Sequence, residues 1–394
     1  MAEARRDVWI TGIGVVSCLG EGPEAHWRRL NDPQPTADTK TFAPYIVHPI
    51  VPIDFDKQIP KKGDQRQMEA WQRIGTYAAG LALDSAGVKG DADLLGRMDM
   101  LIAAGGGERD WAADGAILTG LSKAEQRERF LNERLMSDLR PTLFLAQLSN
   151  LLAGNISIVH GVTGSSRTLM GEESAGLDAV RTALARVRSG QSEITLVGGA
   201  HNGERKDLLM LYEFGGYNLK GGFRPVWDRA PGGGFALASL AAFLVLESGA
   251  HAGARGAKPM ARLSEVMVER SDRTPGAIEA ALRRMWAQMQ VDAPHAAVVS
   301  GASGAEPATS EERSFLAQHP GTAVRATGTH IGHGVEPQFA MNIAIAALAL
   351  IHGRLFPPCD STGFEKPMEG SLRQVIVTGV GHWRGEGMAL LEAV

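Results

Sequence analysis

The stretch Val8-Trp9-Ile10-Thr11-Gly12-Ile13-Gly14 opens the chain with an apolar run that meets glycine, and Thr378-Gly379-Val380-Gly381 repeats its ending near the C-terminus. A short apolar run bounded by glycine is typical of a buried strand. Two short matches can arise by chance, because glycine is abundant in this chain. They are also what a duplicated fold would leave, with two related halves that meet near residue 250.

Similar apolar runs recur along the chain, and helical patterns lie between them. The runs cover residues 101–104, 194–197, 241–246, 296–299 and 375–380, and the helical patterns cover residues 67–86, 176–189, 275–289 and 339–352. Strands that are apolar throughout are buried on both faces, and their alternation with helices is typical of sheets covered by helices on both sides. The sequence therefore predicts an α/β protein.

The composition is that of an ordinary globular protein, and it argues against several classes of partner. Of the 394 residues, 44% are hydrophobic and 21% are charged, and the formal net charge is −4. This balance gives no electrostatic attraction to nucleic acid or to an anionic membrane. We therefore expect neither nucleic acid nor membrane as a partner.

The cysteine count and the apolar runs bear on location. Cys18 and Cys359 are too few to form a disulfide framework, which favours a reducing compartment. No signal-peptide pattern precedes the first strand, and the longest apolar run, residues 339–351, is too short to span a bilayer. We expect a cytoplasmic protein.

Three short motifs could carry chemistry, and each has a simpler interpretation. Gly12-Ile13-Gly14 lacks the third glycine of a dinucleotide-binding loop, so a tight turn is favoured. His330 and His333 have a spacing that could hold a metal, but no third ligand is evident. Glu172 and Glu173 begin an alanine-rich helix, where acids interact well with unpaired N–H groups. From these patterns we expect neither a cofactor nor a metal.

Several stretches, taken in order along the chain, resemble the type II elongating β-ketoacyl-acyl-carrier-protein synthases. They are the opening strand at residues 8–20, the basic segment 61–71, the segment 155–164 before the family's active-site turn, the strand 196–200, the segments 223–228 and 243–247, the loop 327–334 and the closing strand. The resemblance implies a thiolase-like fold, with two similar βαβαβ-type halves in a five-layer α-β-α-β-α arrangement. Residues 1–250 would form one half, with dimer-interface insertions, and residues 251–394 the other.

The resemblance also implies a chemistry, and this chain departs from it. Active members carry a cysteine at a buried helix N-terminus, where thiolate is favoured, and two histidines and a lysine nearby. Here Glu173 stands at the nucleophile position, Gly301 at the first histidine and Gly328 at the lysine, whereas His333 is retained. The family's Gly-Phe-Gly-Gly turn is Gly381-His382-Trp383-Arg384, which puts His382 at the gate position. We expect no catalytic residue.

A buried carboxylate without a partner is costly, so we expect Glu173 to pair with a donor such as His333 or Arg384. The resemblance then favours a chain-length-factor-like subunit, which would pair with an active β-ketoacyl synthase in fatty-acid or polyketide biosynthesis. Two alternatives stay open. The chain could be a malonyl-carrier-protein decarboxylase-type enzyme, although Gly301 removes one of the paired histidines, or a homodimeric scaffold or binding protein that reuses the fold.

Two surfaces follow from the same resemblance. The segment 111–150 would supply much of the dimer interface. The acyl carrier protein would land on the helix that carries Lys61, Lys62, Arg66 and Arg73, although such charges are as often only a solvated surface. The pathway and the chain length of the product depend on side chains whose placement the sequence does not give.

Overall fold

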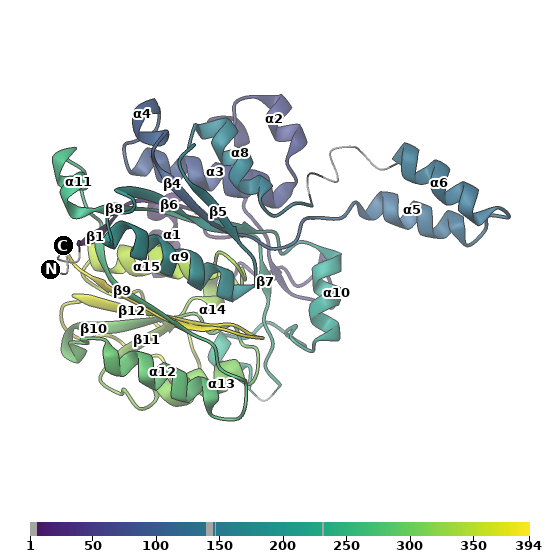
Figure 1. Ribbon diagram of the computed structural model, residues 1–394. Helices are drawn as coiled ribbons and strands as arrows, with labels where there is room; N and C mark the ends of the chain where they lie inside the picture. The colour runs from purple at the N-terminus through teal and green to yellow at the C-terminus, as the bar shows by residue number, and fades with distance from the viewer. Residues whose placement is uncertain (1–5, 139–144, 146, 231) are drawn as a thin grey trace.

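Two five-stranded sets with the same strand order build the protein (Figure 1). The computed structural model describes residues 6–394 apart from 139–144, 146 and 231. The first set is β1 (Val8–Ser17), β4 (Asp99–Ala103), β5 (Ser166–Leu169), β6 (Ile194–His201) and β8 (Leu240–Ser248); the second is β9 (Ala261–Glu269), β10 (Ala296–Ser300), β11 (Ala323–Ala326), β12 (Gln374–Val380) and β13 (Glu386–Glu392). In space each set runs third, second, fourth, fifth, first, and β1 pairs with β9 to join them.

The helices between the strands also correspond. In the first half α3 (Ala70–Ser85) follows the first strand, α8 (Leu151–His160) the second and α9 (Glu173–Arg188) the third; in the second half α12 (Ala277–Gln288), α13 (Ala308–Leu316) and α15 (Gln338–Ile351) do the same. Helices α9 and α15 lie between the two sets of strands, and the others cover the outer faces (Figure 1). The expected five-layer α/β arrangement of two similar halves is confirmed. The exact division at residue 250, which falls within α11 (Gly249–Ala254), stays a prediction.

The remaining elements decorate this frame. They are α1 (Gly22–Asn31), α2 (Lys62–Gln67), α4 (Ala92–Leu95), α5 (Trp111–Leu121), α6 (Arg127–Asp138), α10 (Lys206–Phe214), α14 (Gly328–Ile331), the short strands β2 (Gly20–Glu21), β3 (Val47–His48) and β7 (Leu237–Ala238), and three single turns of 3-10 helix. Helices α5 and α6 form a hairpin that projects away from the layered body (Figure 1). Among the described residues, no helix combines the length and the apolar character that crossing a bilayer requires.

The glycines of the opening stretch serve packing, and the tight turn expected there is wrong. Gly12 and Gly14 lie inside β1, which continues to Ser17. A Cβ atom on Gly12 would lie 2.5 Å from the carbonyl oxygen of Ala82, and one on Gly14 would lie 2.0 Å from that of Ala78. Helix α3 therefore lies directly on this strand, and only glycine allows that distance.

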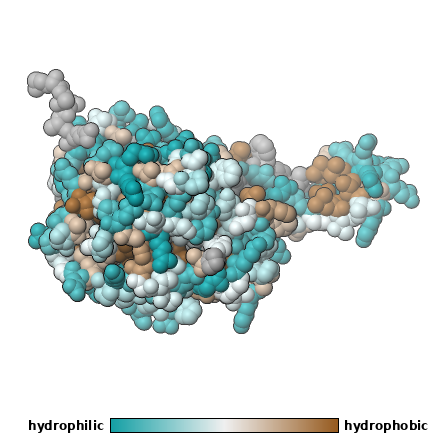
Figure 2. Space-filling model, turned by 90° about the horizontal axis from the view of Figure 1, so that it is seen from below, coloured by the Kyte–Doolittle hydropathy of each residue, from teal (hydrophilic) through white to brown (hydrophobic). Residues whose placement is uncertain are grey.

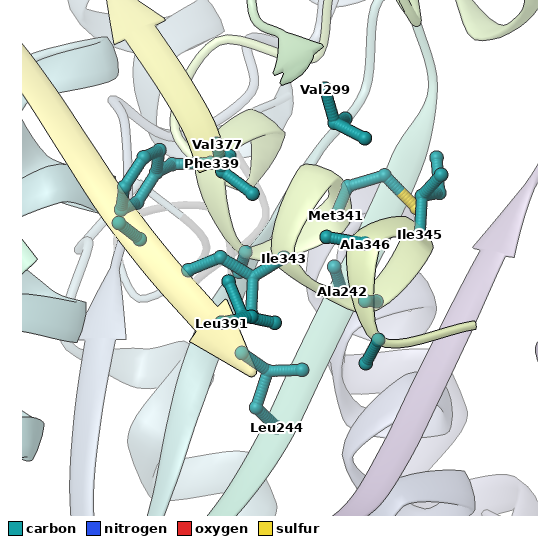
Figure 3. Packing of buried hydrophobic residues seen from close by; sticks show 14 of the residues in the cluster. Ala242, Leu244, Val299, Phe339, Met341, Ile343, Ile345, Ala346, Val377 and Leu391 are labelled. Atoms are coloured by element: carbon teal, nitrogen blue, oxygen red, sulfur yellow. The ribbon is translucent and has the colours of Figure 1, made fainter. Parts of the chain in front are cut away.

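Helix α15 occupies the centre of the main hydrophobic core, which both halves share. Figure 3 shows its side chains packed among residues of β8, β10, β12 and β13, including Leu244, Val299, Val377 and Leu391. Every residue of α15 except the last is buried, which explains an apolar pattern without a polar face. The two halves thus pack around one pair of central helices.

Candidate functional site

The position that the resemblance assigns to the family's nucleophile lies at a strained turn between β5 and α9. Glu172 adopts φ 52° and ψ −136°, a region that residues with a side chain rarely occupy. Such a residue costs about 1–3 kcal/mol and persists only where its surroundings hold it. The turn places Glu173 at the first position of α9, where it is 6% exposed.

Two histidines from distant parts of the chain contact the Glu173 carboxylate. The Nε2 atom of His333 lies 2.7 Å from Oε1, and the Nδ1 atom of His382 lies 2.8 Å from Oε1 and 3.0 Å from Oε2. The backbone N–H of His382 also donates to Oε1, at 3.3 Å. The predicted contact with His333 is confirmed. Arg384 instead lies 3.5 Å from Glu172, and the second partner of Glu173 is His382.

These contacts decide the charge of the group. Burial by itself would raise the pKa of Glu173, but the charge of His382 and the hydrogen bonds from both histidines outweigh it, so this pKa lies well below its ordinary value. Burial lowers the pKa of His382, and the attraction of Glu173 more than reverses that effect, so the pKa of His382 is raised. Glu173 is therefore an ionised carboxylate inside the protein.

Aromatic rings fix the orientation of the two imidazoles. Tyr217 and Tyr212 meet the His382 ring edge-on, with centroids 4.6 Å and 5.4 Å away. Phe235 lies 5.0 Å from the His333 ring and 5.7 Å from that of His382. Because rings packed in this way cannot swing freely, the nitrogen atoms stay directed at the carboxylate.

The two glycines that the resemblance places at the family's first histidine and lysine positions are closely packed. A Cβ atom on Gly301, at the end of β10, would lie 2.6 Å from the carbonyl oxygen of Thr378. A Cβ on Gly328 would lie 2.9 Å from the carbonyl oxygen of Ala302 and 3.1 Å from a methyl group of Val226. Neither a histidine at 301 nor a lysine at 328 would fit without a shift of the neighbouring backbone.

A cavity of about 10 Å³ lies beside the carboxylate, lined by Glu173, His333 and Gly301 together with Leu177, Gln338, Phe339, Asn342, Gly379 and Val380. This is close to the smallest volume that holds one water molecule. The Nδ2 atom of Asn342 is buried and has no hydrogen-bond partner among the described residues. The wall of the cavity therefore offers one unused donor.

Neither cysteine lies in this site. Cys18 follows β1, 3.8 Å from Nδ1 of His48 and 3.5 Å from the carbonyl oxygen of His330, and burial raises the pKa of its thiol to about 11. Burial also raises the pKa of Cys359. Because the reactive form of cysteine is the thiolate, both thiols are in the unreactive form at neutral pH.

His330 and His333, whose sequence spacing could suit a metal site, do not direct their imidazole rings to one point. The ring of His330 packs edge-on against Phe356, and burial lowers the pKa of His330 to about 4. His333 faces Glu173. Among the described residues, Glu173, His333 and His382 form a group whose ligand atoms lie within 4.8 Å of one another. The partner of His333 is thus far away in sequence.

A second buried acid–base pair escaped the sequence reasoning. Nδ1 of His201, at the end of β6, lies 3.0 Å from Oε2 of Glu336, and both side chains are 7% exposed. A Cβ on Gly105 would lie 2.5 Å from Oε1 of Glu336, so this glycine makes room for the acid. The pair has no motif, because its members come from different halves of the chain.

The four basic residues expected to receive a carrier do not share one helix. Lys61 precedes α2, Lys62 and Arg66 belong to α2, and Arg73 belongs to α3, because the chain breaks its helix at Met68 and Glu69. The first three are exposed. Arg73 is partly buried and lies over the ring of Phe55, 5.6 Å from its centroid, so it is not a free surface charge.

Comparison with known sequences decides the family. Residues 5–252 match the family described as beta-ketoacyl synthase, N-terminal domain. The chain belongs to this family. A 3-oxoacyl-[acyl-carrier-protein] synthase 2 of Vibrio harveyi is 27% identical over 274 residues, which cover 66% of this chain and 62% of that protein. The aligned part thus spans about three fifths of the curated relative's length.

Solved structures of β-ketoacyl synthases share the fold. The ishigamide ketosynthase/chain length factor superposes with a TM-score of 0.79 at 21% identity, covering 99% of this chain and 100% of that one. A type II polyketide synthase acyl-carrier protein in complex with its ketosynthase gives a TM-score of 0.75 at 17% identity, with coverage of 99% and 100%. At these identities the likeness concerns the fold alone.

Proposed function

We propose that the protein is a non-catalytic, chain-length-factor-like member of the β-ketoacyl synthase family that pairs with an active ketosynthase in fatty-acid or polyketide biosynthesis. One observation carries the proposal. An ionised carboxylate, Glu173, held by His333 and His382, occupies the head of the helix where the resemblance expects a reactive thiol.

The chemistry of a carboxylate supports an inactive site. To carry an acyl group, Glu173 would have to form an anhydride, which hydrolyses too readily to wait for a second substrate. Loss of a nucleophile commonly costs about 10⁶-fold in rate. The tight packing around Gly301 and Gly328 further argues against a side chain that polarises a carbonyl at either position.

Exposed apolar side chains support a partner subunit on one side of the molecule. On the α5–α6 hairpin, Leu118 and Met136 are 67% and 79% exposed, and a brown patch on the projecting part of the molecule marks such residues in Figure 2. Ile158 of α8 and Met170 after β5 are also exposed. An apolar surface of this kind is typical of a protein–protein interface. Residues 139–144 and 146 of the expected interface segment lie outside the described residues.

The position of β5 at the edge of the sheet supports a partner subunit on the same side of the molecule. Among the described strands, β5 pairs only with β4, and its first two residues are exposed. An edge strand of this kind can pair with another chain. A partner seated on β5, α8 and the hairpin would bury both the strand edge and the apolar side chains.

A carrier-protein contact is the less supported part of the proposal. Lys61, Lys62 and Arg66 are exposed and close together around α2, which suits an acidic partner, although Lys62 also pairs with Asp56. The acyl carrier protein complex of a related ketosynthase is a precedent for such a partner.

Co-expression with a cysteine-bearing ketosynthase from the same organism tests the pairing. We expect a 1:1 complex by native mass spectrometry, and condensation of malonyl units by the complex but not by this chain alone. A complex whose ketosynthase has lost its own cysteine is the matched control and should be inactive. A stable homodimer that captures no ketosynthase would contradict the proposal and favour a scaffold.

The variant Glu173→Cys tests the inactivity separately. A thiol at residue 173 should react with an alkylating probe, yet give no condensation above buffer, because Gly301 and Gly328 supply none of the missing groups. Condensation by this variant alone, or carbon dioxide release from a malonyl carrier by the unmodified chain, would show that the site is still catalytic.

A further inference from the structure

The contacts of Glu173 have a geometry that a simple ion pair does not need. Three ligand atoms from three separate segments converge on one point: a carboxylate oxygen of Glu173, Nε2 of His333 and Nδ1 of His382. We propose that these three side chains bind one divalent transition-metal ion, zinc in the first place. The inference does not depend on a partner subunit.

The ligand set suits zinc. Two imidazoles and one carboxylate are a common set in sites with three protein ligands and one open position. Two atoms that each lie about 2.1 Å from a tetrahedral zinc ion are about 3.4 Å apart. The carboxylate contacts of 2.7–3.0 Å therefore require the ligand atoms to separate by about 0.4–0.7 Å.

The site is held from outside, as a metal site must be. The two histidine rings pack against Phe235, Tyr212 and Tyr217. The turn that carries His382 is braced by Arg273, whose guanidinium donates to the carbonyl oxygens of Gly381 and Trp383 at 2.8 Å and 3.0 Å. Preorganised ligands lose little freedom when an ion binds.

The cavity beside Glu173 and His333 supplies the fourth position. It has room for about one water molecule. The unpaired amide nitrogen of Asn342 lines this cavity, and it can donate to a water molecule bound to the metal. A buried donor without a partner is unusual in a folded protein, and a metal-bound water would satisfy it.

The local charge also suits a cation. Glu173 supplies a carboxylate, and the carboxylate of the adjacent Glu172 lies beside it in the chain, where its Oε2 atom forms an ion pair with Nε of Arg384 at 3.5 Å. The nearby guanidinium groups are directed elsewhere, that of Arg384 towards Glu172 and that of Arg273 in an ion pair with Glu386. A bound ion would fasten α9, the loop after α14 and the turn after β12 to one another.

Metal content of the purified full chain tests the proposal. The protein is produced with a tag that contains no histidine, incubated with zinc sulfate and desalted, and its zinc is measured by elemental analysis. We expect one zinc ion per chain. Cobalt(II) replaces zinc in a parallel sample, and the strong visible bands of four-coordinate cobalt would report the proposed geometry.

Two variants remove one ligand each with little change of shape. Glu173→Gln keeps the volume of the side chain, and His382→Phe restores the aromatic residue that the resemblance places there. Each should weaken zinc affinity by more than about 100-fold, the upper end of the loss that removal of an outer-shell partner causes. His352→Gln, at an exposed histidine stacked on Trp27, is the control and should bind as the unmodified chain does.

The outcomes separate the possibilities. Equal zinc in all four proteins, or no zinc in the unmodified chain, overturns the proposal and leaves the group a hydrogen-bonded cluster. If Glu173→Gln fails to fold, His382→Phe decides, because phenylalanine suits its aromatic surroundings. A protein that binds zinc but captures no ketosynthase would retain the metal site and refute only the proposed function.

Discussion

The two halves of the molecule have the same strand order, yet they differ in what lies between their second and third strands. In the first half residues 104–165 fill this position with the α5–α6 hairpin and α8, whereas residues 301–322 in the second half form little more than α13. The exposed apolar side chains of the hairpin have no counterpart on α13. The common frame therefore supplies stability, and the longer connection supplies the candidate partner surface.

Acid should reveal the largest difference between the halves. In the first half burial lowers the pKa of His26 and His160 to about 4 and that of His48 to about 3, whereas in the second half it lowers that of His330 to about 4 and also lowers that of His319. Between pH 6.5 and pH 4 these histidines are protonated in the unfolded chain but stay neutral in the folded chain. The free energy of unfolding therefore falls as the pH falls through this window. Each histidine lowers the free energy of unfolding by up to about 3 kcal/mol across this window.

Hydrogen exchange measured from pH 7 to pH 4.5 checks this expectation. Amides of the first half should lose protection before those of β12 and β13. The variant His160→Gln, which takes up no proton, should reduce the slope of unfolding free energy against pH. Uniform loss of protection across both halves, with an unchanged slope, would break the comparison.

Charge on the hairpin should abolish pairing. The double variant Leu118→Glu and Met136→Glu would bring two carboxylates into an apolar contact, and we expect the affinity for a ketosynthase to fall by about 3 kcal/mol or more, which is at least about 100-fold. Titration of labelled chains measures this. Ile351→Glu, at an exposed site on α15, is the control and should pair normally.

The central layer should tolerate no added methyl group. A Cβ on Gly176 of α9 would lie 2.3 Å from the carbonyl oxygen of Glu336, immediately before α15. We expect Gly176→Ala to lower the free energy of unfolding by about 1–3 kcal/mol, because one of the two backbones must move. Denaturant unfolding at neutral pH gives the value. An unchanged denaturant midpoint would mean that α9 and the backbone before α15 can move apart at little cost in free energy.

The hairpin should respond in the opposite sense. Gly115 lies within α5, and a Cβ atom there would meet no atom within 4 Å. Because alanine is the better helix former, Gly115→Ala should stabilise α5 by about 0.5–1 kcal/mol. Exchange of the α5 amides is the measurement. Destabilisation would show that the hairpin packs against something in the isolated chain.

The arrangement of strands and helices was largely accessible from the sequence, but the extent of the elements was not. The apolar pattern predicted a helix over 339–352, close to α15, because a helix buried on all sides needs no polar face. The pattern predicts that the strand at Val8 ends at the glycines and that the basic segment 61–71 belongs to one helix. In both places a contact with a distant element, or a break at Met68, decided the boundary.

The sequence by itself determined which family frame the chain adopts, since this follows from the identity and order of its motifs, and it predicts that Glu173, Gly301 and Gly328 stand at the positions of the reactive groups. Only the tertiary structure decided that both His382 and His333 contact the carboxylate of Glu173. The same holds for the contact between His201 and Glu336. The members of these contacts lie 209, 160 and 135 residues apart. Their meeting depends on how the two halves pack across α9 and α15, and no local pattern encodes that packing.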